Sequence, residues 1–249
     1  MKRVLVTGAS GFVGRQVTPL LAASGWDVHG VTSRARPARA ALTWHEADLL
    51  DAAQRERLVE RVQPSALLHL AWSSEPPGYW TDPANVSWLA ASLELARHFQ
   101  QRGGTRLVGA GTCAEYDWRG GICVERSTPL APRSLYGSAK AACGTVLEAF
   151  GVQTGMSVAW GRLFFLFGPH DSPVRLVPSL VQRMASGRPA RCTAGGHQRD
   201  LLHVADAAAA LVALLESPVT GPVNIGSGVA LRIGDVARRI AEVLETPAL

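Results

Sequence analysis

Thr7-Gly8-Ala9-Ser10-Gly11-Phe12-Val13-Gly14 is the stretch of sequence that decides the fold. It ends an apolar run, residues 2–7, that reads as a short buried strand, and it opens a segment, residues 12–24, that is apolar at helical spacing. Three glycines at this spacing let the chain turn tightly, let backbone approach a pyrophosphate and let the helix pack on the strand. The free N–H groups at a helix N-terminus also attract phosphate. The stretch therefore predicts a dinucleotide site, rather than an ordinary glycine-rich turn.

Beyond this stretch, apolar runs of strand length alternate with segments of helix length over the first two thirds of the chain. The expected strands are residues 2–7, 27–32, 42–47, 66–70, 105–110 and 157–163. The expected helices are residues 12–24, 51–62, 82–102 and 134–153. Such alternation is typical of βαβ units, which place helices on both faces of a parallel sheet. The pattern therefore predicts an α/β fold with a Rossmann-type, doubly wound parallel sheet.

The pattern changes after Gly168-Pro169. Elements become shorter and proline and glycine more frequent, with residues 204–216 and 233–244 as the clearest helices. We expect residues 1–169 to form the cofactor-binding Rossmann domain, which carries the catalytic residues. Residues 170–249 are expected to be mainly a small mixed α/β substrate lobe, with some segments returning to the large domain. A chain of 249 residues, 47% of them hydrophobic, can bury one core and such a lobe.

Composition argues against several classes of protein. Charged residues are 18% and no apolar run approaches the thickness of a bilayer, so neither disorder nor a membrane span is expected. The apolar run after Lys2-Arg3 breaks at Thr7-Gly8, which does not fit a signal peptide. The four cysteines form no CxxC pair and no metal-ligand spacing, which indicates a reduced, cytoplasmic protein without a metal. The net charge of +5 comes from scattered basic residues, so it predicts small anionic ligands and not nucleic acid.

The end of the second expected strand bears on the choice between NAD and NADP. An NAD site usually places an acid there to bind the ribose 2′-hydroxyl, whereas this chain reads Thr32-Ser33-Arg34. Ser33 and Arg34 can meet a 2′-phosphate, the arginine through two parallel hydrogen bonds. The sequence therefore favours NADP(H) over NAD(H), with solvated loop residues as the alternative reading. Asp48-Leu49, after the third expected strand, is placed to meet the adenine ring, unless Asp48 caps a helix.

Tyr136 and Lys140 stand four residues apart in an expected helix and therefore on one face of it. Lys140 is one of two lysines among 25 basic residues, which suggests a task that arginine cannot perform. A nearby ammonium and an oxidised nicotinamide favour tyrosinate, so such a tyrosine can donate a proton to a carbonyl oxygen or take it back. The Thr112 hydroxyl, at the end of the fifth expected strand, can hold the same oxygen. We predict that these three residues are the catalytic set; the alternative is a surface Tyr–Lys pair.

These features resemble an extended short-chain dehydrogenase/reductase, the family of nucleotide-sugar epimerases, dehydratases and 4-ketoreductases. Besides the glycine loop and the Tyr136/Lys140 pair, the resemblance rests on Asp48-Leu49, His69-Leu70-Ala71, Asn85, Gly111-Thr112-Cys113-Ala114-Glu115-Tyr116, Arg162-Leu163-Phe164, Gly168-Pro169-His170-Asp171, Arg199-Asp200-Leu201-Leu202-His203-Val204-Ala205-Asp206 and Asn224-Ile225-Gly226-Ser227-Gly228. The matches run over nearly the whole chain and are highly specific as a set.

The resemblance implies particular binding residues. For the cofactor they are Gly8, Ser10, Gly11, Phe12, Val13, Gly14, Ser33, Arg34, Asp48, Leu49, Leu70, Ala71, Trp72, Asn85, Tyr136, Lys140 and Phe164. For a nucleotide-diphospho-sugar substrate it implies Arg199, near the phosphates. Trp72 and Cys113 are further candidates from their place beside the expected active site; the alternative for both is ordinary packing. The resemblance also implies a homodimer through helices 82–102 and 134–153, although an intramolecular contact explains the small residues of these helices equally well.

Departures from the family pattern narrow the expected reaction. Family dehydratases carry an acidic pair just after the catalytic threonine, where this chain has Cys113 and Ala114, so dehydration is not expected. The 4-epimerases usually have an acid where Thr32 stands, and Cys113 lies one position off from the Cys/His pair of reductases that also epimerise. The expected reaction is therefore reduction of a keto group on a 4-keto-6-deoxy nucleotide sugar by NADPH. An epimerase of the same fold and a non-catalytic NADP-sensing regulator are the alternatives.

Two further departures concern the substrate. Family members often have an asparagine two residues after Leu163, where this chain has Phe165. Most members are also longer than a chain ending at Leu249, which leaves open a truncated substrate lobe. Both bear on the identity of the substrate, which depends on the shape of the pocket rather than on the fold.

Overall fold

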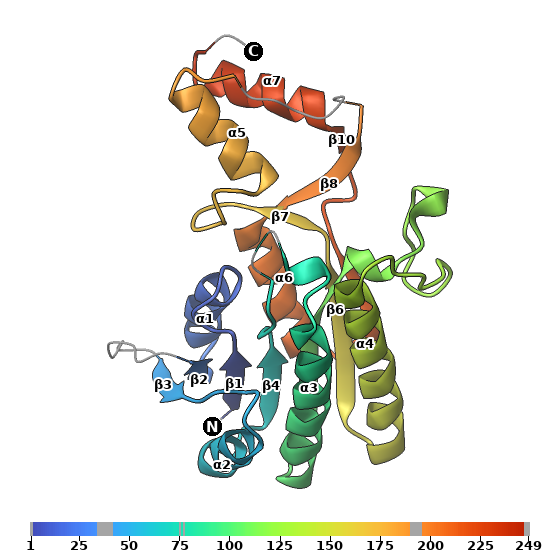
Figure 1. The fold of residues 1–249 in the computed structure, drawn as a ribbon. Coiled ribbons are helices and arrows are strands. Elements are labelled where there is room, and N and C mark those ends of the chain that lie inside the picture. Colours follow the sequence, from blue (N-terminus) through green and yellow to red (C-terminus); the bar gives the residue numbers. More distant parts are fainter. Residues whose placement is uncertain (1, 34–41, 75, 77, 190–195, 247–249) are drawn as a thin grey trace.

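A large α/β body makes up most of the molecule, and a small lobe stands at one end of it (Figure 1). The structure is a computed structural model that describes residues 2–33, 42–74, 76, 78–189 and 196–246. Within these residues no helix is both long and apolar enough to cross a membrane.

A seven-stranded parallel sheet forms the centre of the large body, with the strand order β3-β2-β1-β4-β5-β6-β9. Its strands are β1 (Arg3–Thr7), β2 (Asp27–Thr32), β3 (Thr43–Glu46), β4 (Ala66–His69), β5 (Arg106–Thr112), β6 (Ser157–Leu163) and β9 (Gly221–Ile225). The chain builds outward from β1 to β3 and then returns to the other side of β1 as β4. Ligands of doubly wound sheets bind at such a reversal, outside the carboxyl ends of the strands. The predicted Rossmann-type sheet is confirmed.

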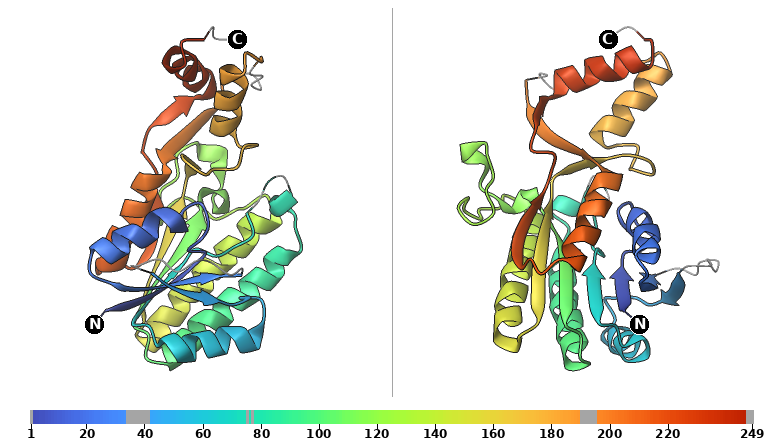
Figure 2. Two further views of the ribbon diagram at one scale, coloured as in Figure 1. Left: turned by 90° about the vertical axis from the view of Figure 1, so that its left-hand side faces the viewer. Right: turned by 180° about the vertical axis from the view of Figure 1, so that it is seen from behind.

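Helices cover both faces of this sheet (Figure 2). Helices α1 (Gly14–Ala23) and α6 (Val204–Glu216) lie on one face, and α2 (Ala52–Val62), α3 (Ala84–Gln101) and α4 (Leu135–Thr154) on the other. Side chains alternate between the two faces of a strand. Val4 and Val6 of β1 therefore join the hydrophobic cluster with α1 and α6, whereas Leu5 joins the cluster with the other three helices.

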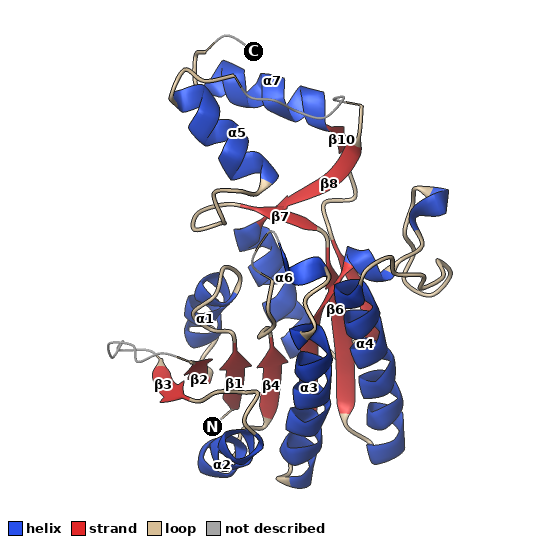
Figure 3. Cartoon of the chain, in the orientation of Figure 1, coloured by secondary structure: helices blue, strands red, loops and turns tan. Residues whose placement is uncertain are grey.

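The small lobe combines a three-stranded sheet with two helices (Figure 3). Its strands are β7 (Phe165–Phe167), β8 (Gln198–His203) and β10 (Ala230–Arg232), and its helices are α5 (Leu176–Ala185) and α7 (Ile233–Val243). The sheet is mixed, because β8 pairs parallel with β7 and antiparallel with β10. This confirms the predicted mixed α/β lobe.

Side-chain caps fix the starts of α2 and α4. The Asp51 side chain accepts the amide of Gln54 and caps α2, so Asp48 is not the cap. The Ser134 side chain accepts the amide of Gly137 and caps α4. Satisfying the free N–H groups at this end fixes the first turn of α4, which carries Tyr136.

Candidate active site

The glycine loop packs closely against the chain that leaves β4. Gly8 has a φ of 66°, and a Cβ at this residue would lie 2.9 Å from the amide nitrogen of Ala71. A Cβ at Gly14 would lie 2.1 Å from the carbonyl oxygen of Gly8. The loop therefore leaves no room for side chains at these two positions. Such a bare backbone, opening a helix, fits the phosphates of a dinucleotide.

We expect Gly14→Ala to weaken binding of the dinucleotide by at least about tenfold, because the added methyl group must push the backbone of this loop aside. Isothermal titration calorimetry measures this loss. Gly120→Ala is the matched control, because a Cβ at Gly120 meets nothing within 4 Å. Equal affinity in the Gly14→Ala and wild-type proteins would contradict the assignment of this loop.

A buried chain of hydrogen bonds holds the end of β4 against the loop. Thr7 Oγ1 accepts the amides of Leu70 and Ala71, both at 3.1 Å, and lies 2.8 Å from His69 Nδ1. His69 Nε2 lies 2.8 Å from Ser92 Oγ, which donates to a backbone carbonyl. Burial lowers the pKa of His69 to about 3, so the ring is neutral. Because the Ser92 hydroxyl donates elsewhere, Nε2 of the ring carries the proton and donates to Ser92 Oγ. His69 is therefore structural, and Leu70 and Ala71 are the residues that face the cavity.

A cavity of about 1670 Å³ extends from the glycine loop to the small lobe. Most of the predicted site residues line it: Gly8, Ser10, Gly11, Phe12, Val13, Gly14, Ser33, Leu70, Ala71, Trp72, Thr112, Cys113, Tyr136, Phe164 and Arg199. Of the predicted site residues that the structure describes, four are not among the lining residues: Asp48, Leu49, Asn85 and Lys140. Arg34 lies outside the described residues.

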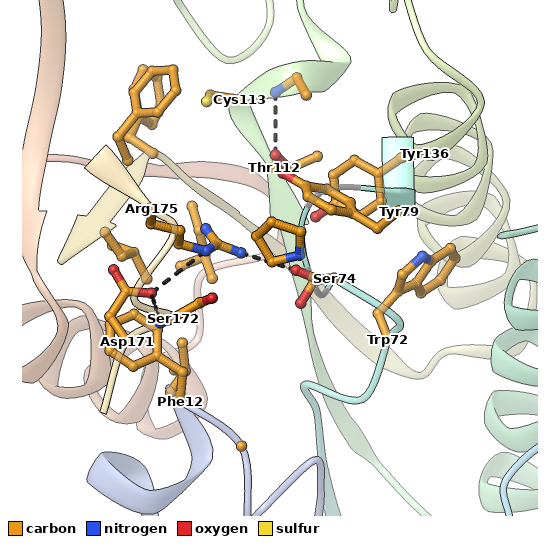
Figure 4. Close-up of a pocket in the computed structure, with 18 of the residues that line it drawn as sticks. Phe12, Trp72, Ser74, Tyr79, Thr112, Cys113, Tyr136, Asp171, Ser172 and Arg175 are labelled. Carbon is orange, nitrogen blue, oxygen red and sulfur yellow. Dashed lines mark hydrogen bonds and ion pairs between the residues drawn. The ribbon is translucent and has the colours of Figure 1, made fainter. Parts of the chain in front are cut away.

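Thr112 and Tyr136 meet on one side of this cavity (Figure 4). Thr112 ends β5 and Tyr136 lies in the first turn of α4, so the sheet edge and the helix bring the two hydroxyls together. Burial raises the pKa of Tyr136, and its hydrogen bond with Thr112 offsets only part of that increase. The phenol therefore carries its proton in this cavity.

Lys140 lies behind the cavity wall. It is 3% exposed, and its Nζ donates to the carbonyl oxygen of Ala110 at 2.8 Å. Burial lowers the pKa of this ammonium to about 8. Because Lys140 is buried, Tyr136 and Lys140 do not form a solvated pair at the surface.

Beneath Thr112, a buried carboxylate joins three elements. Glu115 Oε1 accepts the amide of Thr112 at 2.8 Å and the indole N–H of Trp160 at 2.9 Å. Its Oε2 accepts from Arg162 Nε at 2.7 Å. Arg162 Nη1 also donates to the hydroxyl of Tyr116. This network fixes the end of β5 and so the position of the Thr112 backbone.

Several predicted binding residues have other partners. Asp48 is exposed, and its Oδ1 accepts the amide of Leu50, while Leu49 is buried in the core. Asn85 is 1% exposed and holds the indole N–H of Trp72. Burial raises the pKa of Cys113 to about 12, which leaves a neutral thiol at the cavity wall.

The lobe side of the cavity is cationic and aromatic. Arg199, predicted from the sequence, lies 5.0 Å above the ring of Phe165, the residue found where relatives often have asparagine. Arg175, not predicted, precedes α5 and also lines the cavity. Its Nη2 donates to the carbonyl oxygen of Ser74 and its Nε lies 3.5 Å from Asp171 Oδ1. Figure 4 shows Arg175 and Asp171 across the cavity from Tyr136. No motif of the sequence marks Arg175.

Tyr79 is a second residue that the sequence did not point to. It is 9% exposed, and its ring stands at right angles to the Tyr136 ring, with 5.0 Å between the two ring centroids. The ring of its neighbour Trp80 is also at right angles to the Tyr136 ring, with 5.6 Å between the centroids. Tyr79 and Trp80 therefore both pack against Tyr136.

The chain belongs to the NAD dependent epimerase/dehydratase family, whose model matches residues 4–226. UDP-glucuronic acid decarboxylase 1 of Xenopus tropicalis is 29% identical to it over 265 residues, which cover 98% of this chain and 60% of the relative. A dTDP-glucose 4,6-dehydratase of Xanthomonas campestris is 27% identical, covering 97% of this chain and 76% of the relative. The resemblance seen in the sequence is thereby confirmed.

Among solved structures, UDP-glucose 4-epimerase of Thermus thermophilus, in complex with NAD, superposes with a TM-score of 0.86 at 26% identity. The match covers 98% of this chain and 84% of the epimerase. The chain spans about 60% of the length of the Xenopus decarboxylase. The three relatives are named for three different reactions on nucleotide sugars, so membership of the family does not decide the reaction of this chain.

Proposed function

We propose that this protein is an NADP(H)-dependent oxidoreductase that reduces a keto group of a nucleotide-activated 4-keto-6-deoxy sugar. The observation that carries the proposal is the pairing of Thr112 and Tyr136 in a cavity that runs from the glycine loop to two arginines of the small lobe. Carbonyl reduction needs these hydroxyls and a hydride source. Elimination of water needs further acid–base groups, and the residues that follow Thr112 are a neutral thiol and an alanine.

A bound reduced nicotinamide supplies the hydride in this reaction. Tyr136 donates its proton to the carbonyl oxygen, and the raised pKa of the buried phenol ensures that the proton is present. Thr112 Oγ1 accepts the amide of Ala114 at 3.2 Å, and its O–H can turn from Tyr136 to donate to the same oxygen. The Lys140 ammonium balances the charge that remains on the tyrosine. The three residues thus have separate tasks: protonation, orientation and charge compensation.

The far end of the cavity supports an anionic substrate. Arg175 and Arg199 line it on the small-lobe side, and guanidinium groups bind diphosphates through parallel hydrogen bonds. Aromatic side chains of the same wall, including Phe164 and Phe165, offer faces for a base or a sugar. We assign the nucleotide diphosphate to this end, so that the sugar points toward Tyr136.

We expect Arg34→Ala to weaken NADPH about 10- to 100-fold and NADH less than about threefold, because only NADPH offers a 2′-phosphate. Ser33, next to it, lines the cavity, which supports a binding role for this segment. Dissociation constants for both cofactors, measured by the change in nicotinamide fluorescence, test the expectation. Equal losses for the two cofactors would remove the argument for phosphate recognition.

The test of the proposed function is a spectrophotometric assay of NADPH oxidation against a panel of 4-keto-6-deoxy nucleotide sugars, with NADH in parallel. Oxidation of one equivalent of NADPH per sugar reduced is the expected result. Isomerisation of the sugar without net oxidation would favour an epimerase. Tight NADPH binding with no turnover on any sugar would favour a sensor.

We further propose that residues 1–169 form the cofactor domain and that residues 170–249 supply mainly the substrate lobe, with α6 and β9 packed into the large body. A homodimer through α3 and α4 is part of the same proposal. Val86 of α3 and Val146 and Val152 of α4 are exposed apolar residues that such an interface would cover. Analytical ultracentrifugation at micromolar concentration should give twice the chain mass, and a monomer at all concentrations would contradict it.

A further inference from the structure

We infer that Trp72 is a positioning residue for the catalytic lysine: its indole ring holds the Lys140 ammonium in place and in its charged form, and Asn85 in turn holds Trp72. The arrangement is independent of the substrate. Its importance for turnover rests on the proposed function.

The ammonium lies close to two indole rings. Lys140 Nζ lies 4.0 Å from the centroid of the Trp72 ring and 5.8 Å from that of Trp160. In the described part of the chain its one hydrogen-bond acceptor is the carbonyl oxygen of Ala110. An ammonium has three N–H donors. The negative face of an indole is therefore the main replacement for the water that this buried cation has lost.

Asn85 uses both of its amide donors and one of its acceptor sites within the protein. Its Oδ1 accepts the indole N–H of Trp72 at 2.8 Å. Its Nδ2 donates to the carbonyl oxygens of Tyr79 at 2.7 Å and Asp82 at 2.8 Å. One buried amide thus fixes both the Trp72 ring and the segment that covers Tyr136. This explains why a residue predicted to bind the cofactor lies outside the cavity lining.

Trp72 also separates Lys140 from the cavity, since Trp72 lines the cavity and Lys140 does not. Burial lowers the pKa of Lys140 to about 8, while the nearby Glu115 and Cys143 raise it in part. Of the other titratable groups nearby, His69 is neutral and Tyr136, one turn earlier in α4, carries its proton. The ammonium is therefore held close to its point of deprotonation, and the ring of Trp72 shifts that balance toward the charged form. Removing the ring should lower the pKa of Lys140 further.

The chain offers a direct measurement, because it contains only two lysines, Lys2 and Lys140. Protein labelled with ¹³C,¹⁵N-lysine gives two side-chain signals by NMR, and Lys2→Arg assigns them. A cation–π contact of about 0.5–2 kcal/mol corresponds to about 0.4–1.5 pKa units. We expect Trp72→Leu to lower the pKa of Lys140 by this amount and Trp72→Phe to lower it less. Trp44→Leu, which removes an indole from β3, is the control and should leave it unchanged.

A second series of variants keeps the test valid if Trp72→Leu does not fold. Tryptophans carrying one to four fluorine atoms, incorporated at position 72, keep the shape of the ring and weaken its negative face. The pKa of Lys140 should fall stepwise with the number of fluorine atoms. A flat series, or an unchanged pKa in folded Trp72→Leu, would overturn the inference.

The NMR titration needs no substrate, so it separates this inference from the proposed function. If a substrate is found, kcat can be measured against pH. The alkaline limb of that profile should move to lower pH in Trp72→Leu by the same interval as the pKa of Lys140. A fall in pKa with no shift of that limb would limit Trp72 to a structural role and overturn its role in turnover.

Discussion

Replacing Tyr136 with phenylalanine is expected to lower turnover by about 10²- to 10⁴-fold, because it removes the only proton that the mechanism delivers to the carbonyl oxygen. The aromatic ring remains, so its edge contacts with Tyr79 and Trp80 are kept. NADPH affinity should stay within about twofold, because the loss concerns the transition state and not the binding of cofactor. Pre-steady-state measurement of NADPH oxidation separates the two quantities.

Tyr79→Phe provides a matched comparison. The Tyr79 ring centroid lies 5.0 Å from that of Tyr136. The substitution removes a phenolic oxygen from the same cavity but leaves the Thr112–Tyr136 pair in place. We expect it to slow turnover by less than about tenfold, the loss typical of a single orienting contact. If both variants lost activity equally, Tyr136 would be one polar contact among several. Retained activity in Tyr136→Phe would remove the catalytic assignment altogether.

The fold was predictable because its signals are local. Apolar strand runs and amphipathic helices alternate strictly, and the expected helix at 134–153 corresponds to α4 (Leu135–Thr154). The glycine loop was predictable for the same reason, since the close approach of Gly14 to Gly8 is a contact within one turn. Such features depend on residues a few positions apart, and these can be read from a single chain.

Contacts between distant segments could not be predicted in this way. The sequence placed Asn85 and Lys140 at the cofactor, but the loop after β4 brings Trp72 between them and the cavity. Arg175 reaches the cavity because its guanidinium group bonds to Ser74, about a hundred residues earlier. No periodicity marks a contact of this kind. Binding of the cofactor by Asn85 and Lys140 stays a prediction, to which the structure adds the contacts of both residues with Trp72.

Replacing Glu115 with alanine is expected to cost about 3–5 kcal/mol of unfolding free energy, because it leaves Arg162 buried without its counter-charge. Glu115 is fully buried and the Arg162 side chain is 7% exposed. Urea denaturation followed by tryptophan fluorescence gives the change. Glu148→Ala is the control, since Glu148 forms a 3.5 Å pair with Arg126 at the surface, where such a pair contributes less than about 1 kcal/mol.

The cost should come mainly from the charge left behind and not from the lost attraction. Glu115→Leu combined with Arg162→Met removes both charges, so this double variant should be more stable than Glu115→Leu alone. Recovery should be incomplete, because Arg162 also donates to the Tyr116 hydroxyl and the Glu125 carbonyl oxygen. A double variant no better than the single one would mean that the hydrogen bonds of Glu115 to Thr112 and Trp160 carry the stability. In that case the carboxylate matters as an acceptor that shapes the end of β5, and its pairing with Arg162 is secondary.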